Sequence, residues 1–293
     1  MKIAFSPCPN DTFVFHALVH GLIPGAPKLE VTYADIDITN TLASSSTELD
    51  ILKISYAALP WVLPEYKLLP CGGALGRGCG PLVLTAGSGE QNGSDSSNSG
   101  RNNSHSFTAS QLSGKRVAVP SERSTAYLLF RLWAAQNVPG GVGEIIVMPF
   151  HEIMPAVRDG LIDAGLVIHE ARFTYPEYGL KLMVDLGSWW ESDTGLPIPL
   201  GAIIAKRSLD LPAITAWIRS SVQHAWAHPE QSELYIMEHA QEMDTHVAQS
   251  HISLYVNEFT ENLGEIGYDA VTVLLGRAMK ENLIPPMDLT LLR

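Results

Sequence analysis

The feature that most constrains the fold is an alternation of short, mainly apolar runs with longer amphipathic segments. Such runs occur at residues 2–5, 50–54, 115–119 and 164–168, and helix-like segments separate them. Short uninterrupted apolar runs are typical of strands buried on both faces of a parallel sheet, and the intervening helices make the crossovers. We therefore predict an α/β fold.

The length of the chain favours two such units. At 293 residues it exceeds the size of most single cores, so two α/β lobes are expected, with one large domain as the alternative. Residues 72–80 are rich in glycine, but a dinucleotide-binding fingerprint would open a helix directly after a strand. Here Pro81 and the apolar run 82–85 follow instead, which favours a hinge-like chain crossover.

The strand predicted at 164–168 leads into the most informative stretch of the sequence, residues 167–177. His169 stands there at the carboxyl end of a buried strand, the edge at which open α/β sheets bind their ligands. A histidine in this position acts either as a general base or as a polar cap that satisfies a nearby carbonyl. Position alone leaves both roles open.

Polar residues follow the first strand as well. The turn at residues 6–11 contains two prolines, which fix its backbone and let it present Ser6, Asn10 and Asp11 together with the free N–H groups of the next helix. We predict that Asn10 or Asp11 caps that helix. Capping alone and capping combined with ligand contact remain equal alternatives.

Two further strand ends carry candidate ligand-binding residues. The strand at 50–54 ends in Lys53, Ile54 and Ser55, where the lysine could neutralise a substrate carboxylate while Ser55 donates a hydrogen bond. The alternative is an exposed lysine that flanks the strand. After the strand at 115–119, Ser124 or Thr125 opens a helix through about residue 136, as a cap or as a ligand contact.

Charge and cysteine content exclude several classes of protein. The net charge of −12 and the scattered basic residues argue against a nucleic-acid partner. No apolar run approaches the ~20 residues of a membrane span, and the start lacks a secretory signal, so we expect a cytoplasmic protein without a membrane partner. Three cysteines without CxxC spacing suggest reduced thiols and no metal site. Cys8 is expected to be partly exposed, and the oligomeric state stays open.

Two other segments give specific expectations. Residues 86–113 are dominated by Ser, Gly, Asn and Gln, which predicts a mobile surface insertion. We expect that deletion of residues 88–106 leaves activity intact. Trp189 and Trp190 lie in what we predict to be a proline-bounded loop. Core packing is their expected role, with a lid wall as the alternative.

With these pieces placed, the sequence resembles the 1,4-dihydroxy-6-naphthoate synthases of the futalosine route to menaquinone. The resemblance covers nearly the whole chain outside the insertion. It is carried by residues 6–13 with 15–17, residues 53–55, 125–127 and 168–175, residues 185–187 with 189–190, and residues 194–201.

The resemblance implies a two-lobed fold like that of type II periplasmic binding proteins, with the ligand cleft between the lobes. Residues 1–82 and 202–293 would form a discontinuous first lobe, and residues 83–201 the second. The glycine-rich run and the segment near Gly201 would then be the crossovers. The insertion would belong to the second lobe.

The resemblance also implies an activity. The family cleaves a carbon–carbon bond in cyclic dehypoxanthine futalosine to release the dihydroxynaphthoate, without a metal or organic cofactor. Its base corresponds to His169, and its substrate contacts to the segment 53–55 and to Thr125 and Ala126. A serine at 124 replaces the threonine expected there, which could soften substrate binding.

Two alternatives remain from the sequence. One is a solute-binding protein that captures a small carboxylic acid without chemistry, against which the missing secretory signal speaks. The other is a chorismate dehydratase of the same pathway and fold. The motifs at 6–13 and around His169 favour the naphthoate synthase.

Overall fold

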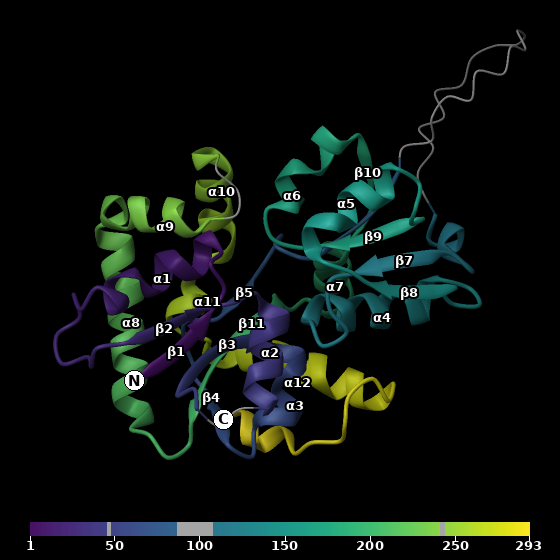
Figure 1. Cartoon of the computed structure of the whole chain (residues 1–293). Coiled ribbons are helices and arrows are strands. Elements are labelled where there is room, and N and C mark those ends of the chain that lie inside the picture. Colours follow the sequence, from purple (N-terminus) through teal and green to yellow (C-terminus); the bar gives the residue numbers. More distant parts are fainter. Residues whose placement is uncertain (46–47, 87–107, 241–243) are drawn as a thin grey trace, which may run out of the picture.

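Two β-sheets, one in each lobe, organise the computed structural model, which describes residues 1–45, 48–86, 108–240 and 244–293 (Figure 1). The first sheet has the order β2-β1-β3-β11-β4, and β5 pairs with the far part of β11. Its strands are β1 (Lys2–Phe5), β2 (Glu30–Tyr33), β3 (Ile51–Ser55), β4 (Tyr66–Leu68), β5 (Ala74–Gly76) and β11 (Ile198–Lys206).

The second sheet has the order β10-β6-β9-β7-β8. Its strands are β6 (Leu82–Ala86), β7 (Arg116–Val119), β8 (Glu144–Val147), β9 (Ala164–Val167) and β10 (Leu180–Asp185). The α/β class is therefore confirmed, but the sheets are mixed rather than wholly parallel. β6 and β11 run antiparallel to their neighbours β9 and β3, because the chain enters each from the other lobe without a crossover helix.

Helices cover both sheets (Figure 1). The helices that precede β6 or follow β11 in the chain are α1 (Pro9–Val19), α2 (Ile36–Ser45), α3 (Leu59–Val62), α8 (Leu211–Ala227), α9 (Glu233–His239), α10 (Thr245–Tyr255), α11 (Glu258–Glu261) and α12 (Gly264–Lys280). Between β6 and β11 lie α4 (Thr125–Asn137), α5 (Phe150–Arg158), α6 (Ala171–Thr174) and α7 (Leu186–Thr194). The short 3₁₀ helices are η1 (Tyr56–Ala58), η2 (Ala109–Leu112), η3 (Tyr175–Tyr178), η4 (Pro229–Ser232) and η5 (Leu289–Leu292).

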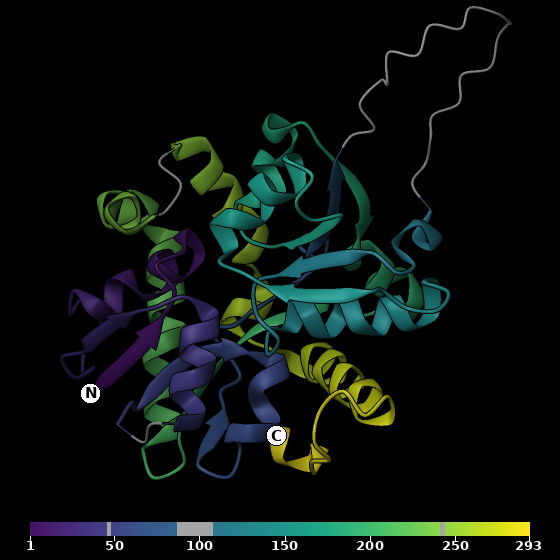
Figure 2. The same cartoon turned by 45° about the vertical axis from the view of Figure 1, so that its right-hand side comes forward.

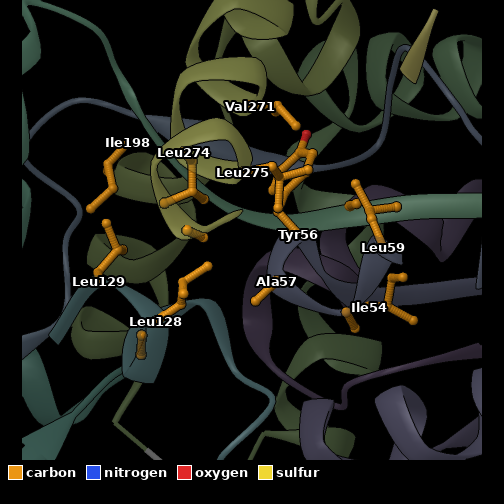
Figure 3. Packing of buried hydrophobic residues seen from close by; sticks show 14 of the residues in the cluster. Ile54, Tyr56, Ala57, Leu59, Leu128, Leu129, Ile198, Val271, Leu274 and Leu275 are labelled. Atoms are coloured by element: carbon orange, nitrogen blue, oxygen red, sulfur yellow. The ribbon is translucent and has the colours of Figure 1, made fainter. Parts of the chain in front are cut away.

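One of the hydrophobic clusters of buried residues extends through both lobes. Figure 3 shows Ile54 and Leu59 from the first lobe in the same cluster as Leu128 of α4 and Leu274 of α12. Figure 2 shows α12 close to α4, and the two helices are in contact. The lobes are thus joined by shared packing as well as by the strands that cross between them.

Three expectations about local structure are wrong. Cys8, not Asn10 or Asp11, is the N-cap of α1, because Pro9 already takes the first helical position that prolines favour. Residues 186–194 form the helix α7 rather than a loop, since Asp185 accepts hydrogen bonds from the N–H groups of residues 187 and 188. Cys8 is buried rather than partly exposed.

The expected tryptophan packing is confirmed for Trp190, which is fully buried and donates a hydrogen bond from Nε1 to the Pro197 carbonyl at 3.0 Å. Most of the predicted mobile insertion, residues 87–107, lies outside the described residues. Residues 108–112 contradict that prediction, because they form a capped 3₁₀ turn whose Leu112 is buried in the core. No helix among the described residues has the length and apolarity needed to cross a membrane.

Candidate active site

A cleft with a cavity volume of about 80 Å³ lies between the lobes, where the ends of β1, β3 and β9 meet the start of α4. Nine of the candidate residues predicted from the sequence line it: Ser6, Asn10, Asp11, Lys53, Ser55, Ser124, Thr125, Ala126 and His169. Ile54 is the exception, because its side chain points into the hydrophobic core. A second hollow shares Ile168 and His169 with the cleft. His169 therefore stands where two cavities meet.

His169 adopts a left-handed backbone conformation with φ of 53°, two residues beyond the end of β9. Residues other than glycine rarely take this conformation, and the surrounding structure must hold it in place. The imidazole Nδ1 lies 3.6 Å from Sγ of Cys8, and the edge of Phe150 contacts the ring. Because Nδ1 faces the Cys8 sulfur, Nε2 is the ring nitrogen that is available to a ligand in the cleft.

Cys8 contacts the candidate base as a neutral thiol. Burial, followed by the nearby Glu170 carboxyl, raises the pKa of Cys8 well above its usual value. The Ser6 hydroxyl donates to Sγ at 2.9 Å. Ligand atoms of Cys8, His169 and Glu170 lie within 4.8 Å of one another, but metals bind thiolates rather than thiols. We therefore interpret Cys8 as a hydrogen-bonding neighbour of His169, not as a nucleophile or metal ligand.

Lys53 is not an exposed lysine, and its charge is already paired. Its ammonium lies 2.5 Å from Oδ1 of Asp11, and both side chains are only 3% exposed. Asp11 sits in the first turn of α1, where the helix dipole favours an acid, and the Asn10 amide donates to the same oxygen at 2.8 Å. The pair contributes a fixed dipole to the cleft rather than a free cation.

Ser55 closes β3 with its polar groups held in place. The Asn40 amide oxygen accepts a hydrogen bond from the Ser55 backbone N–H at 2.8 Å, and the Asn40 amide nitrogen donates to the Ser55 hydroxyl at 3.0 Å. Because that hydroxyl oxygen already accepts, its own hydrogen is the group that can be offered to a ligand.

Thr125 and Ala126 begin α4, whose N-terminus faces the cleft. Ser124 is the N-cap and accepts from the Tyr127 N–H, as one of the two sequence alternatives predicts. The Thr125 hydroxyl donates to the Leu200 carbonyl at 2.7 Å and accepts from the Ala57 N–H at 3.2 Å. Thr125 therefore ties the lobes together through its side chain. The first N–H groups of α4 have no acceptor within the helix and can bind an anion.

Sequence reasoning missed His251 and Tyr255, which both line the cleft from α10. Both residues lie in the second half of α10. The signal was present, because Ala248, His251 and Tyr255 recur at helical spacing and share the buried face. The His251 ring lies parallel to that of His169, with centroids 6.0 Å apart and an interplanar angle of 14°.

Arg172 holds the loop that carries His169. Its guanidinium donates to the Gly80 carbonyl at 2.7 Å and to Asp185 at 2.5 Å, so it fastens α6 to the chain crossover before β6. Gly80 itself lies against Gly187, where an added Cβ would come within 2.1 Å of the backbone nitrogen. A side chain at position 80 would therefore force the backbone around Gly187 to shift.

The fold is shared with ligand-binding proteins. An aliphatic sulphonate binding protein of Escherichia coli matches 99% of this chain and 90% of its own, with a TM-score of 0.67 at 13% identity. A crystal structure of a protein from Archaeoglobus fulgidus matches 97% of this chain and 98% of its own, with a TM-score of 0.82 at 31% identity. Fold and site thus define a protein of the periplasmic-binding-protein fold with two histidines, His169 and His251, in the cleft between its lobes.

Sequence comparison gives the family. The profile of the menaquinone biosynthesis family matches residues 1–280, and the chain belongs to that family. A relative from Streptomyces coelicolor, named 1,4-dihydroxy-6-naphthoate synthase, is 63% identical over 98% of this chain and 95% of its own length. A Thermus thermophilus protein of the same name is 42% identical over 98% and 96% of the two lengths. The chain is accordingly an enzyme.

Proposed function

We propose that this enzyme is a 1,4-dihydroxy-6-naphthoate synthase, a carbon–carbon lyase that converts cyclic dehypoxanthine futalosine to 1,4-dihydroxy-6-naphthoate with His169 as general base. The observation that carries the proposal is the position of His169. It lines the same cleft as Lys53, Ser55, Thr125 and Ala126, which were expected to bind the substrate.

The base is suited to its task. An imidazole ring nitrogen can accept a proton and return it, which is why histidine is the residue that most often acts as a general base. His169 Nε2 removes a proton from the bound substrate, the carbon–carbon bond to the sugar-derived ring breaks, and the remaining bicycle becomes aromatic. Cys8 holds the ring from its other nitrogen.

The substrate carboxylate binds at the N-terminus of α4. Because Lys53 is neutralised by Asp11, the free N–H groups of Thr125 and Ala126 and the hydroxyl of Ser55 take the role that the sequence assigned partly to the lysine. A site built from neutral donors can hold the anion without a charge that would compete with the base. We take the lobes as residues 1–82 with 202–293, and 83–201.

The test is conversion of the substrate by the purified protein. Incubation with cyclic dehypoxanthine futalosine yields 1,4-dihydroxy-6-naphthoate, detected by liquid chromatography with mass spectrometry, and incubation with chorismate yields nothing. Recovery of both compounds unchanged would indicate a solute-binding protein instead. Loss of water from chorismate would indicate the dehydratase.

A further inference from the structure

The second hollow adjoins the cleft at the candidate base. Its cavity volume is about 610 Å³, against about 80 Å³ for the cleft. The two cavities share Ile36, Ser124, Ile168 and His169, so a ligand that occupies both lies beside the imidazole of His169. Ligand pockets commonly measure about 300–1,000 Å³, and the cleft alone falls below that range. A substrate with a bicyclic acid and a sugar-derived ring must therefore extend from the cleft into the hollow.

The walls of the hollow offer different hydrogen-bonding groups from those of the cleft. One wall is the start of α2 with the residue before it, and it carries the carboxylates of Asp35 and Asp37. The opposite wall contains Ser121 and His151 from the second lobe. No lysine or arginine is among the described residues that line the hollow. Carboxylates accept hydrogen bonds from hydroxyl groups and repel other carboxylates, so these walls suit a hydroxyl-bearing group rather than an acid.

Ser121 adds a donor to this set. Its Oγ already accepts a hydrogen bond from the Arg123 backbone N–H at 3.2 Å, so its own hydrogen can be offered to a ligand. The Ser121 carbonyl accepts from the Ser124 hydroxyl at 3.0 Å, and Ser124 is the N-cap of α4. The donor wall of the hollow is therefore tied directly to the helix N-terminus that faces the cleft.

We propose that the second hollow binds the hydroxyl-bearing, sugar-derived part of the substrate, with Asp35 and Asp37 as acceptors and Ser121 as a donor. The proposal rests on the synthase activity proposed above. The two cavities then sort the ends of the substrate by charge. Ser55 and the N-terminus of α4 receive the carboxylate in the cleft, whereas the acidic wall of the hollow repels it. This orientation places the bond that breaks at the junction, beside His169.

The first test is calorimetric and needs no turnover. In the His169→Asn protein, titrations compare cyclic dehypoxanthine futalosine with 1,4-dihydroxy-6-naphthoate, which lacks the sugar-derived part. Asp35→Ala and Asp37→Ala each weaken the affinity for the substrate by about five- to tenfold, because a charged acceptor of hydroxyl hydrogen bonds is lost. Both leave the affinity for the naphthoate unchanged. Glu152→Ala is the matched control, since Glu152 is an exposed acid in the first turn of α5 that does not line the hollow, and it changes neither affinity.

The second test fills the hollow. The Ile38 side chain lines it and is 49% exposed, so a larger side chain there occupies the hollow without disturbing the core. Ile38→Trp weakens the affinity for the substrate by more than about tenfold and leaves that for the naphthoate unchanged. An equal loss for both ligands, or no loss for either, would overturn the proposal even if Asp35→Ala does not fold.

The outcomes also separate this proposal from the synthase activity. Turnover by the wild type together with unchanged substrate affinity in the variants of the hollow would refute the subsite alone. Absence of turnover by the wild type together with losses confined to the substrate would refute the synthase activity alone.

Discussion

The Lys53–Asp11 pair should respond unequally to the loss of each partner. Asp11→Ala leaves a buried ammonium whose other neighbour is the Gly72 carbonyl at 3.4 Å, so the free energy of unfolding falls by about 3–5 kcal/mol. Lys53→Met leaves a carboxylate that keeps the Asn10 amide and the first turn of α1, worth up to ~1 kcal/mol, so the loss is about 2–4 kcal/mol.

Urea denaturation followed by tryptophan fluorescence at neutral pH measures both losses. The double variant Asp11→Ala with Lys53→Met should be more stable than Asp11→Ala alone, since it leaves no unpaired charge in the interior. The exposed pair Arg158–Asp159 is the matched control, and Asp159→Ala should not shift the midpoint. If Asp11→Ala also left the midpoint unchanged, the pair would not be a buried element of the cleft.

Other perturbations test the crossover, the buried histidines and the core. Gly80→Ala lowers the free energy of unfolding by about 1–3 kcal/mol, because its Cβ meets the Gly187 backbone, and a denaturation midpoint equal to wild type would contradict the close approach. Burial lowers the pKa of His16 from 6.5 to about 4 and that of His251 well below 6.5, so the unfolded chain takes up these protons first. Stability therefore falls as the pH drops from about 6.5 through 4, which urea midpoints at stepped pH measure, and a midpoint that rises on acidification would be inconsistent with neutral buried rings. Trp190→Ala costs about 3–5 kcal/mol, and calorimetry showing no drop in Tm would place the side chain outside the core.

Many residues that line the cleft could be predicted because the ends of strands can be recognised in the sequence. The apolar runs that became β1, β3 and β9 end beside polar residues. β1 and β3 are neighbours in the first sheet, β9 lies in the second, and residues after the ends of all three line the cleft between the sheets. His169 and Ser55 could be placed in this way. Their family roles came from the resemblance, not from the pattern.

What the sequence could not give depends on contacts between distant segments. Nothing near Lys53 indicates that Asp11, from another element, neutralises it. His251 reaches the cleft only because α10 packs beside α1, and a histidine on a buried helix face has no local mark of function. The helix α7 was missed for a related reason, since residues 186–194 contain several poor helix formers and Asp185 supplies the cap that starts it.

The central claim is that His169 is the base, and the most direct measurement is the turnover of His169→Asn under saturating substrate. Asparagine keeps a polar side chain that tolerates the left-handed backbone, but it cannot take a proton. We predict that kcat falls by about 10²–10⁴ while the substrate still binds. A turnover close to that of the wild type would contradict the assignment of His169 as the base.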